Sequence, residues 1–151
     1  MWTKKLLLII FFVLSVSYSF PQTKSSVSSR PIPAPAPGNI KLLPEYIHER
    51  KRGVDSARGV ISKKDGLVIN YDIGRMAGNY ANRKIVENKK NIVWQKQEKI
   101  NDDDLLIAYF KDGKIVASFN KESANFFAET RSEKDVADFL EIIKTYNPNK
   151  K

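Results

Sequence analysis

The chain has 151 residues, enough for one domain with a modest core, and its 42% hydrophobic and 28% charged residues exclude a wholly disordered protein. It has no cysteine, which excludes a disulfide scaffold and a thiolate metal site. Its only histidine, His48, excludes a zinc site with two histidines from one chain, and we expect no cofactor.

Residues 1–19 are predicted to be a signal peptide. Lys4 and Lys5 form a basic region, residues 6–14 are an unbroken apolar run, and small residues favour cleavage after Ser19. The run is shorter than the roughly 20 residues of a spanning helix, so cleavage is favoured over the alternative, an uncleaved anchor. No stable membrane span is then expected after cleavage.

The same segment resembles the export signals of Bacteroidota, which often end in an aromatic residue, a small residue and glutamine. Phe20-Pro21-Gln22 departs from that pattern by its proline. The resemblance covers about twenty residues and implies only export, to the periplasm of a bacterium or outside the cell.

Residues 20–38 are predicted to be a tether, because they hold five of the seven prolines and four clustered serines. The alternating prolines at 31–37 favour extended polyproline II, a semi-rigid spacer. A ligand for an aromatic groove is the alternative, but apart from Arg30 the flanking specificity residues are missing.

A single α+β domain is expected over residues 39–148, followed by a basic tail at 149–151. His48 to Arg52 form a charged stretch that suits an edge strand. Asp65-Gly66 predicts a hairpin within residues 59–74, and apolar matching favours the three-residue loop that pairs Ile61 with Ile69.

The middle of the domain is predicted to be extended. Residues 71–80 form a glycine-containing bend, and residues 84–100 resume extended structure with Trp94 as a core or half-buried anchor. Residues 105–110 are the most hydrophobic strand and are expected at the centre of the sheet. Asp112-Gly113 predicts a two-residue turn that pairs Phe110 with Ile115, Ala108 with Ala117 and Leu106 with Phe119.

A helix from Ser132 to about Tyr146 is the most legible element. Ser132 is a good N-cap, and Asp135 stands where a capping box needs an acidic side chain. One apolar stripe runs along this helix, and Asn147-Pro148 ends it. We expect Phe139, Leu140 and Ile143 to pack on a sheet face that carries Leu106, Ala108, Ala117 and Phe119, with Lys144 on the opposite side.

The predicted fold is therefore an α+β domain, an antiparallel β meander of about five or six strands covered by one C-terminal helix. The alternative is a small, partly open β-barrel with the same helix.

Electrostatics suggest one candidate site. Six of the nine net positive charges lie in the signal, the tether and the tail, but a basic stretch remains between residues 83 and 99. Basic residues interleaved with an aromatic can bind anionic polymers, although a solvated surface is the plainer interpretation. The candidate polyanion-binding residues are Arg83, Lys84, Lys89, Lys90, Lys96, Lys99 and Trp94.

The other chemical signals are weak. Asp102, Asp103 and Asp104 could bind a hard cation, but a full calcium loop is absent and a solvated turn is the plainer interpretation. Asp72, near Tyr71 and Arg75, is the best acid–base candidate, but it is also an ordinary turn residue. No Gly-x-Ser-x-Gly nucleophile motif occurs, and residues 71–80 match no phosphate-binding loop.

These observations favour an exported, non-catalytic binding or interaction domain whose ligand the sequence does not identify. Its partner is expected to be an extracytoplasmic protein or a glycan rather than a nucleic acid. Two alternatives stay open: a small secreted hydrolase that uses carboxylates near Asp72, and a binder of anionic polymers through residues 83–99.

Overall fold

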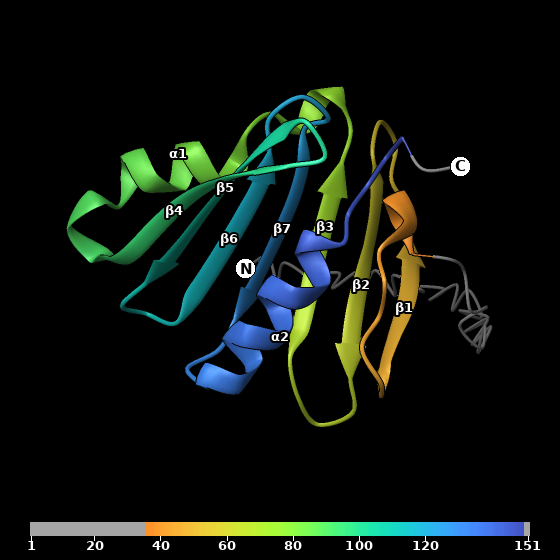
Figure 1. Cartoon of the computed structure of the whole chain (residues 1–151), viewed down its shortest axis with the longest axis horizontal. Helices are drawn as coiled ribbons and strands as arrows, with labels where there is room; N and C mark the ends of the chain where they lie inside the picture. Colours follow the sequence, from red (N-terminus) through yellow and green to blue (C-terminus); the bar gives the residue numbers. More distant parts are fainter. Residues whose placement is uncertain (1–35, 150–151) are drawn as a thin grey trace, which may run out of the picture.

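A computed structural model describes residues 36–149, which form one seven-stranded antiparallel sheet with a helix on each face (Figure 1). The sheet is open rather than closed into a barrel, which confirms the predicted α+β class. The strands are β1 (Tyr46–Lys51), β2 (Ala57–Lys63), β3 (Val68–Ile73), β4 (Ile92–Ile100), β5 (Asp103–Phe110), β6 (Lys114–Phe119) and β7 (Ala124–Glu129); the helices are α1 (Tyr80–Glu87) and α2 (Glu133–Lys144).

The spatial order β1-β2-β3-β7-β6-β5-β4 departs from a simple meander. Hairpins join β1 to β3 and β4 to β7, and the two runs meet where β3 pairs with β7. The chain crosses from β3 to the far edge through α1 and two short 3₁₀ helices, Arg75–Ala77 and Lys89–Asn91. β7 thus lies at the centre, and β5, which we expected there, lies next to the edge.

Helix α1 differs from the prediction, which places most of its residues in the bend and in an extended stretch. Only Ala81 of the helix is buried, and Ile85, four residues on, is half buried. Two apolar positions are too few to reveal a helical period in sequence. Asn79 caps the helix by accepting a hydrogen bond from the Asn82 amide.

Helix α2 follows the prediction, although it ends at Lys144 rather than near Tyr146. Ser132 Oγ accepts from the Asp135 amide at 3.3 Å, as an N-cap should. Asp135 does not complete a capping box, because its carboxylate accepts hydrogen bonds from Thr130 and Lys63 instead. Lys144 was predicted on the side of the helix opposite the sheet, but its ammonium group pairs with Glu98 of β4.

The hairpin between β2 and β3 has the predicted register. Ile61 pairs with Ile69, and a three-residue loop joins the strands. The two isoleucines are completely buried, whereas a slip of one residue would move the apolar side chains of the slipped strand to the other face of the sheet.

The predicted register between β5 and β6 is wrong by one residue. Tyr109, not Phe110, pairs with Ile115, and Ile107 pairs with Ala117. The loop has three residues and closes at Gly113, which adopts φ +91° and donates its amide to the Phe110 carbonyl. Apolar matching could not distinguish the registers, since both faces of these strands are covered.

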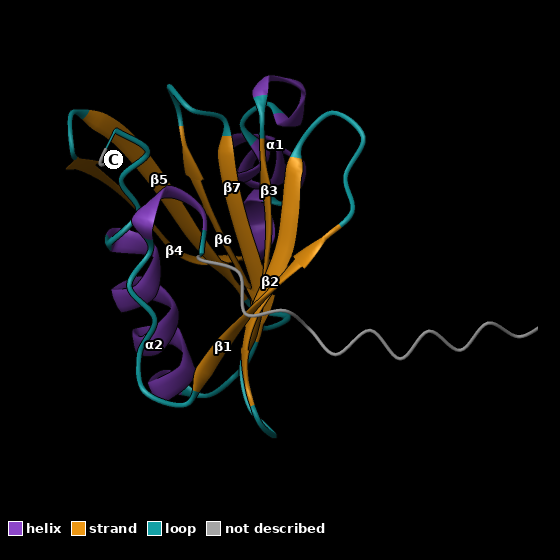
Figure 2. Cartoon of the chain, turned by 90° about the vertical axis from the view of Figure 1, so that its right-hand side faces the viewer, coloured by secondary structure: helices purple, strands orange, loops and turns teal. Residues whose placement is uncertain are grey.

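The two faces of the sheet carry separate cores, and Figure 2 shows a helix on either side. On the α2 face, Phe119, Phe126, Phe139, Ile142 and Ile143 are buried together. Phe139 and Ile143 are therefore buried as predicted, and Ala117 and Phe119 belong to their cluster. Leu106 and Ala108 do not, because the true register turns them toward α1, where they join a smaller core with Ala81, Phe110 and Val116.

β1 forms one edge of the sheet, as its charge predicted, but His48 points inward. Its side chain is 7% exposed, and its Nε2 lies 2.7 Å from the Tyr71 hydroxyl. Before β1, the chain packs along the end of α2: the Asn147 amide donates to the Gly38 carbonyl, and Ala36 packs against the α2-face core.

The predicted signal peptide and most of the predicted tether lie outside the described residues. Within residues 36–149, neither helix has the length and apolar character to span a membrane.

Candidate functional site

A surface hollow lies beside α1, and buried polar side chains fix that helix on the sheet. Asn125 Oδ1 accepts hydrogen bonds from the Tyr80 amide (2.9 Å) and the Ser118 hydroxyl (2.6 Å). Ser118 Oγ in turn accepts from the Ala81 amide (2.9 Å). Asn125 and Ser118 are 2% and 0% exposed, so these bonds satisfy helix amides that burial would otherwise leave unpaired.

The backbone before α1 is shaped for this docking. Gly78 adopts φ +60° and ψ −166°, a region that residues with a Cβ rarely adopt. Its carbonyl accepts a hydrogen bond from Asn125 Nδ2 at 2.9 Å. The first turn of α1 is therefore held against β6 and β7, while the far end of the helix is left to form the wall of a hollow.

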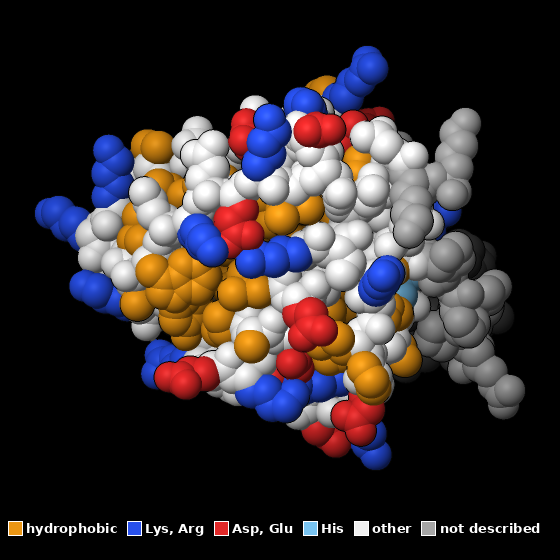
Figure 3. All heavy atoms as spheres, in the orientation of Figure 1, with side chains coloured by type: hydrophobic (Ala, Val, Ile, Leu, Met, Phe, Trp, Pro, Cys, Tyr) orange, Lys and Arg blue, Asp and Glu red, His pale blue; other side chains and the backbone are white. Residues whose placement is uncertain are grey.

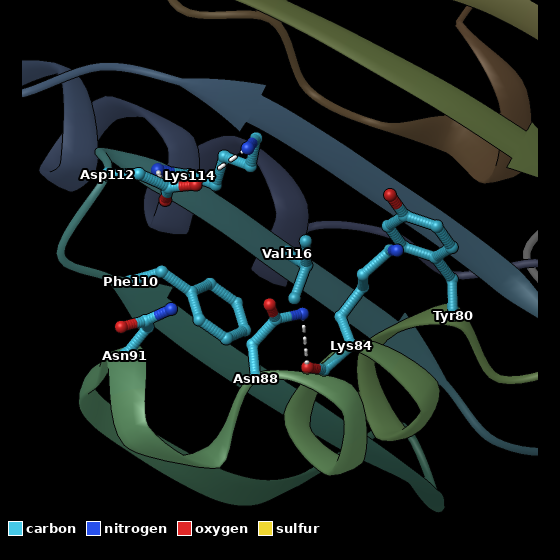
Figure 4. Close-up of a pocket in the computed structure, with 8 residues that line it drawn as sticks. All are labelled: Tyr80, Lys84, Asn88, Asn91, Phe110, Asp112, Lys114 and Val116. Atoms are coloured by element: carbon cyan, nitrogen blue, oxygen red, sulfur yellow. Dashed lines mark hydrogen bonds and ion pairs between the residues drawn. The ribbon is translucent and has the colours of Figure 1, made fainter.

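The first hollow, of about 200 Å³, lies between α1 and the β5–β6 hairpin (Figure 4). Phe110 and Val116 form its floor, Asn88 stands at the end of α1, and Asn91 is the last residue of the following 3₁₀ helix. Lys84 extends along the helix side toward Tyr80, and Lys114 lies on the sheet side next to Asp112. Asn88 Nδ2 donates to the Lys84 carbonyl, which also accepts from the Asn88 backbone amide, and this bond fixes the side-chain amide.

A second hollow, of about 190 Å³, continues from the first across β6, β7 and β3. It shares Tyr80, Lys114 and Val116 with the first hollow and adds Phe127, whose ring lies 5.4 Å from that of Tyr80. We call the two hollows together the α1 groove. Its further lining residues are Asn70, Ala128 and Glu129.

Both lysines of the α1 groove are held by carboxylates on its rim. Lys84 Nζ lies 2.7 Å from Glu87, and Lys114 Nζ lies 2.6 Å from Asp112. These hydrogen bonds lower the pKa of the Glu87 and Asp112 carboxyls, and the bond to Asp112 raises the pKa of Lys114. Exposed ion pairs such as these contribute little net free energy, so a bound anion can replace the carboxylates at little cost.

The basic residues between 83 and 99 do not gather on one face. Lys96 pairs with Glu98, which also pairs with Lys144 of α2, so Lys96 lies on the α2 side of β4. Trp94 lies on that side too, with its ring 5.8 Å from Tyr109. Because successive side chains of a strand point to opposite faces, Lys99 lies on the α1 side of β4. Arg83 and Lys84 are on α1, and Lys89 and Lys90 are in the following 3₁₀ helix.

The face that carries α2 also mixes the two signs of charge. Figure 3, drawn from the same side as Figure 1, shows acidic and basic side chains interspersed across it. Only Lys84 of the proposed polyanion residues lines the α1 groove.

Asp72 lies in β3, not in a bend, and neither proposed neighbour joins it. Tyr71 is buried on the opposite face beside His48. A hollow of about 150 Å³ does bring Asp72 together with Asp55, Ser56 and Arg58. Asp72 Oδ2 lies 3.5 Å from Arg58, and its Oδ1 is buried without a hydrogen-bond partner within residues 36–149.

The three consecutive aspartates take different environments. Asp102 and Asp104 are exposed, whereas Asp103 is 6% exposed and its Oδ1 accepts from the amides of Asp104 and Lys121. Asp103 thus ties the β4–β5 turn to the β6–β7 turn. In the described part of the chain, no group of three or more His, Cys, Asp or Glu side chains is arranged to hold a metal.

A scan of family models found no match to this chain, and searches of curated proteins and of solved structures returned none. The sequence did not reveal most of the α1-groove residues, because α1 was not predicted and because Lys114 comes from a strand far from Tyr80, Asn88 and Asn91 along the chain. The available signal was the run Asn79–Asn91, where a cap residue precedes polar, basic and aromatic side chains.

Proposed function

We propose that this chain is an exported, non-catalytic binding domain whose ligand occupies the α1 groove. The observation that carries this proposal is the groove itself, two adjoining hollows that expose aromatic, amide and ammonium groups on a sheet face that α1 covers only in part. Ligand sites combine an apolar surface with a few fixed polar groups in this way.

The rigidity of the surroundings supports this proposal. The floor residues Phe110 and Val116 are 4% and 3% exposed and belong to β5 and β6, so they are held by the sheet. Asn88 is held by its bond to the helix end. A preformed site binds with less loss of conformational entropy than a site that must order itself.

The test is a screen of neutral, anionic and cationic small molecules against the full-length chain by amide chemical-shift mapping. Ligands should shift amides of α1, β6 and the β5–β6 loop. Asn70→Phe, which fills the second hollow from a half-buried position, should abolish or weaken most of these shifts. Ser62→Phe is the matched control, because Ser62 is half buried on the same face but lines neither hollow.

Two outcomes would contradict the proposal. One is that no molecule shifts the groove amides while other regions respond. The other is that Asn70→Phe binds the same molecules as well as the unsubstituted chain.

The hydrolase hypothesis is a second candidate, supported by the hollow that holds Asp55 and Asp72. Paired carboxylates are the usual requirement for glycoside hydrolysis. The ion pair of Asp72 with Arg58 favours a structural role for this carboxylate instead. Assays with chromogenic glycosides and esters would decide: activity lost in Asp72→Asn supports the hydrolase, and activity that survives the substitution rejects Asp72 as its catalyst.

Polyanion binding by residues 83–99 has less support, since its cations lie on two helical segments and on both sides of β4. Retention on heparin should fall steeply with salt, and charge reversal at Lys89, Lys90 and Lys96 should abolish it, if the hypothesis holds. Retention unchanged by these substitutions would reject it.

A further inference from the structure

The two halves of the α1 groove differ in chemistry. The first hollow presents two ammonium groups and two side-chain amides, from Lys84, Lys114, Asn88 and Asn91. The second presents Val116, Phe127 and the Tyr80 ring, with Lys114 at the junction. A ligand that fills both must therefore have a polar end and an apolar end.

We propose that the α1 groove selects molecules with one carboxylate head and an apolar tail. The head lies in the first hollow between Lys84 and Lys114, and the tail lies against Val116 and Phe127 in the second. This inference rests on the proposed function and names the class of ligand for the same site.

The charges around the first hollow favour an anionic head. Beyond the two lining lysines, the exposed side chains of Lys89 and Lys90 follow Asn88, and Lys111 is tied to Asn91 by a backbone hydrogen bond of 2.8 Å. The opposing carboxylates are those of Glu87 and Asp112, both already paired with the lining lysines, and that of Glu129, which lies opposite Lys114 in β7. Cations therefore outnumber anions at this end.

Specificity against a second carboxylate comes from Glu129, which lies beside the junction of the two hollows. It pairs across the sheet with Lys114 and lines the second hollow, so a second carboxylate on the tail would meet a like charge. The groove should accordingly favour monocarboxylates over dicarboxylates of the same length.

The experiment compares four probes of one chain length: octanoate, 1-octanol, octylammonium and octanedioate. Binding to the full-length chain is measured by shifts of the groove amides at fixed, low ionic strength. Octanoate should bind at least about tenfold more tightly than each of the other three, since a carboxylate between two ammonium groups gains charge-assisted hydrogen bonds.

Three substitutions test whether the lysines cause the preference for octanoate. Lys84→Met should remove most of the preference for octanoate over 1-octanol. Asp112→Asn should tighten octanoate by about two- to fivefold, because Lys114 loses a competing carboxylate. Lys96→Met on the other side of β4 is the control and should change neither.

The two proposals fail in distinguishable ways. If 1-octanol or octylammonium binds the groove as tightly as octanoate, or if Asp112→Asn weakens octanoate, the carboxylate inference is wrong while the groove still binds ligands. If none of the four probes nor any molecule of the wider screen shifts the groove amides, the proposed function itself is wrong.

Discussion

The two faces of the sheet differ in how completely a helix covers them. On the α2 face, a helix of 12 residues covers a core in which Phe119, Phe126 and Phe139 are at most 1% exposed. On the other face, a helix of eight residues covers only part of β5 and β6, and Phe127 and Tyr80 stay half buried. One face provides stability, and the incomplete cover of the other leaves room for a ligand.

The means of attachment differ as well. α2 is held by apolar burial and by Lys63, whose ammonium group contacts Asp135 at 2.7 Å and Asp138 at 3.1 Å. α1 is held mainly by the buried hydrogen bonds of Ser118 and Asn125. A short helix with little apolar burial depends on such polar anchors, because its own propensity cannot keep it folded.

The largest predicted effect tests whether α2 carries the core. Phe139→Ala should cost about 3–5 kcal/mol of unfolding free energy, as expected for a completely buried phenylalanine. Ile85→Ala in α1 should cost only about 1–2 kcal/mol, since Ile85 is half buried. Chemical denaturation would measure both, with exposed Glu141→Ala as the control. Equal costs for Phe139→Ala and Ile85→Ala would refute the contrast between the faces.

The next effect concerns the polar anchor of α1. Asn125→Ala removes the acceptor for the Tyr80 amide and leaves a buried donor unpaired, so it should cost about 2–3 kcal/mol. Hydrogen exchange should accelerate more in α1 than in α2. The exposed Asn120→Ala serves as a control. Uniform acceleration across both helices would mean that Asn125 supports the whole sheet rather than α1.

The loss of unfolding free energy in acid should also depend more on the carboxylates of α2 than on those of α1. Burial alone would raise the pKa of Asp138, but hydrogen bonds from Tyr46, Lys63 and Lys134 outweigh it and lower that pKa below its ordinary value of 3.8. Because the folded-state pKa is the lower one, the stabilisation is present above about pH 4 and is lost as the pH falls through the folded value.

The measurement is the unfolding free energy between pH 2 and pH 6. Asp138→Asn should be less stable than the unsubstituted chain near neutral pH, and the two curves should converge in acid. Glu87→Gln in α1 should leave the curve almost unchanged: the pKa of Glu87 is also lowered by a lysine, but that pair is exposed to solvent. A larger change from Glu87→Gln would contradict the argument.

The smallest predicted effect compares the helix caps. Ser132→Ala and Asn79→Ala should each cost about 1 kcal/mol, because each removes one hydrogen bond to a first-turn amide. Thermal unfolding of the two variants would measure these costs. Similar costs would place the difference between the faces in packing, whereas a much larger cost for Asn79→Ala would show that the cap itself holds α1.

Local patterns in the sequence were enough for the α+β class, the edge position of β1, the β2–β3 register and helix α2. Each depends on neighbours within a few residues: a cap and an apolar stripe for α2, and a loop with two matched isoleucines for the hairpin. Burial of Phe139 and Ile143 followed from the same stripe. The signal peptide and tether are also local interpretations, and they stay predictions.

The tertiary structure alone decided the position of β7 at the centre, the β5–β6 register and the α1 groove. β3 and β7 are far apart in sequence, so no local signal marks their pairing. The register was ambiguous because β5 and β6 are apolar on both faces, and only the presence of α1 makes that pattern favourable. The groove depends on the position of β7 and on the β5–β6 register. Its lysines, amides and aromatic rings become neighbours only when a short helix, fixed by Asn125 and Ser118, leaves the sheet partly uncovered.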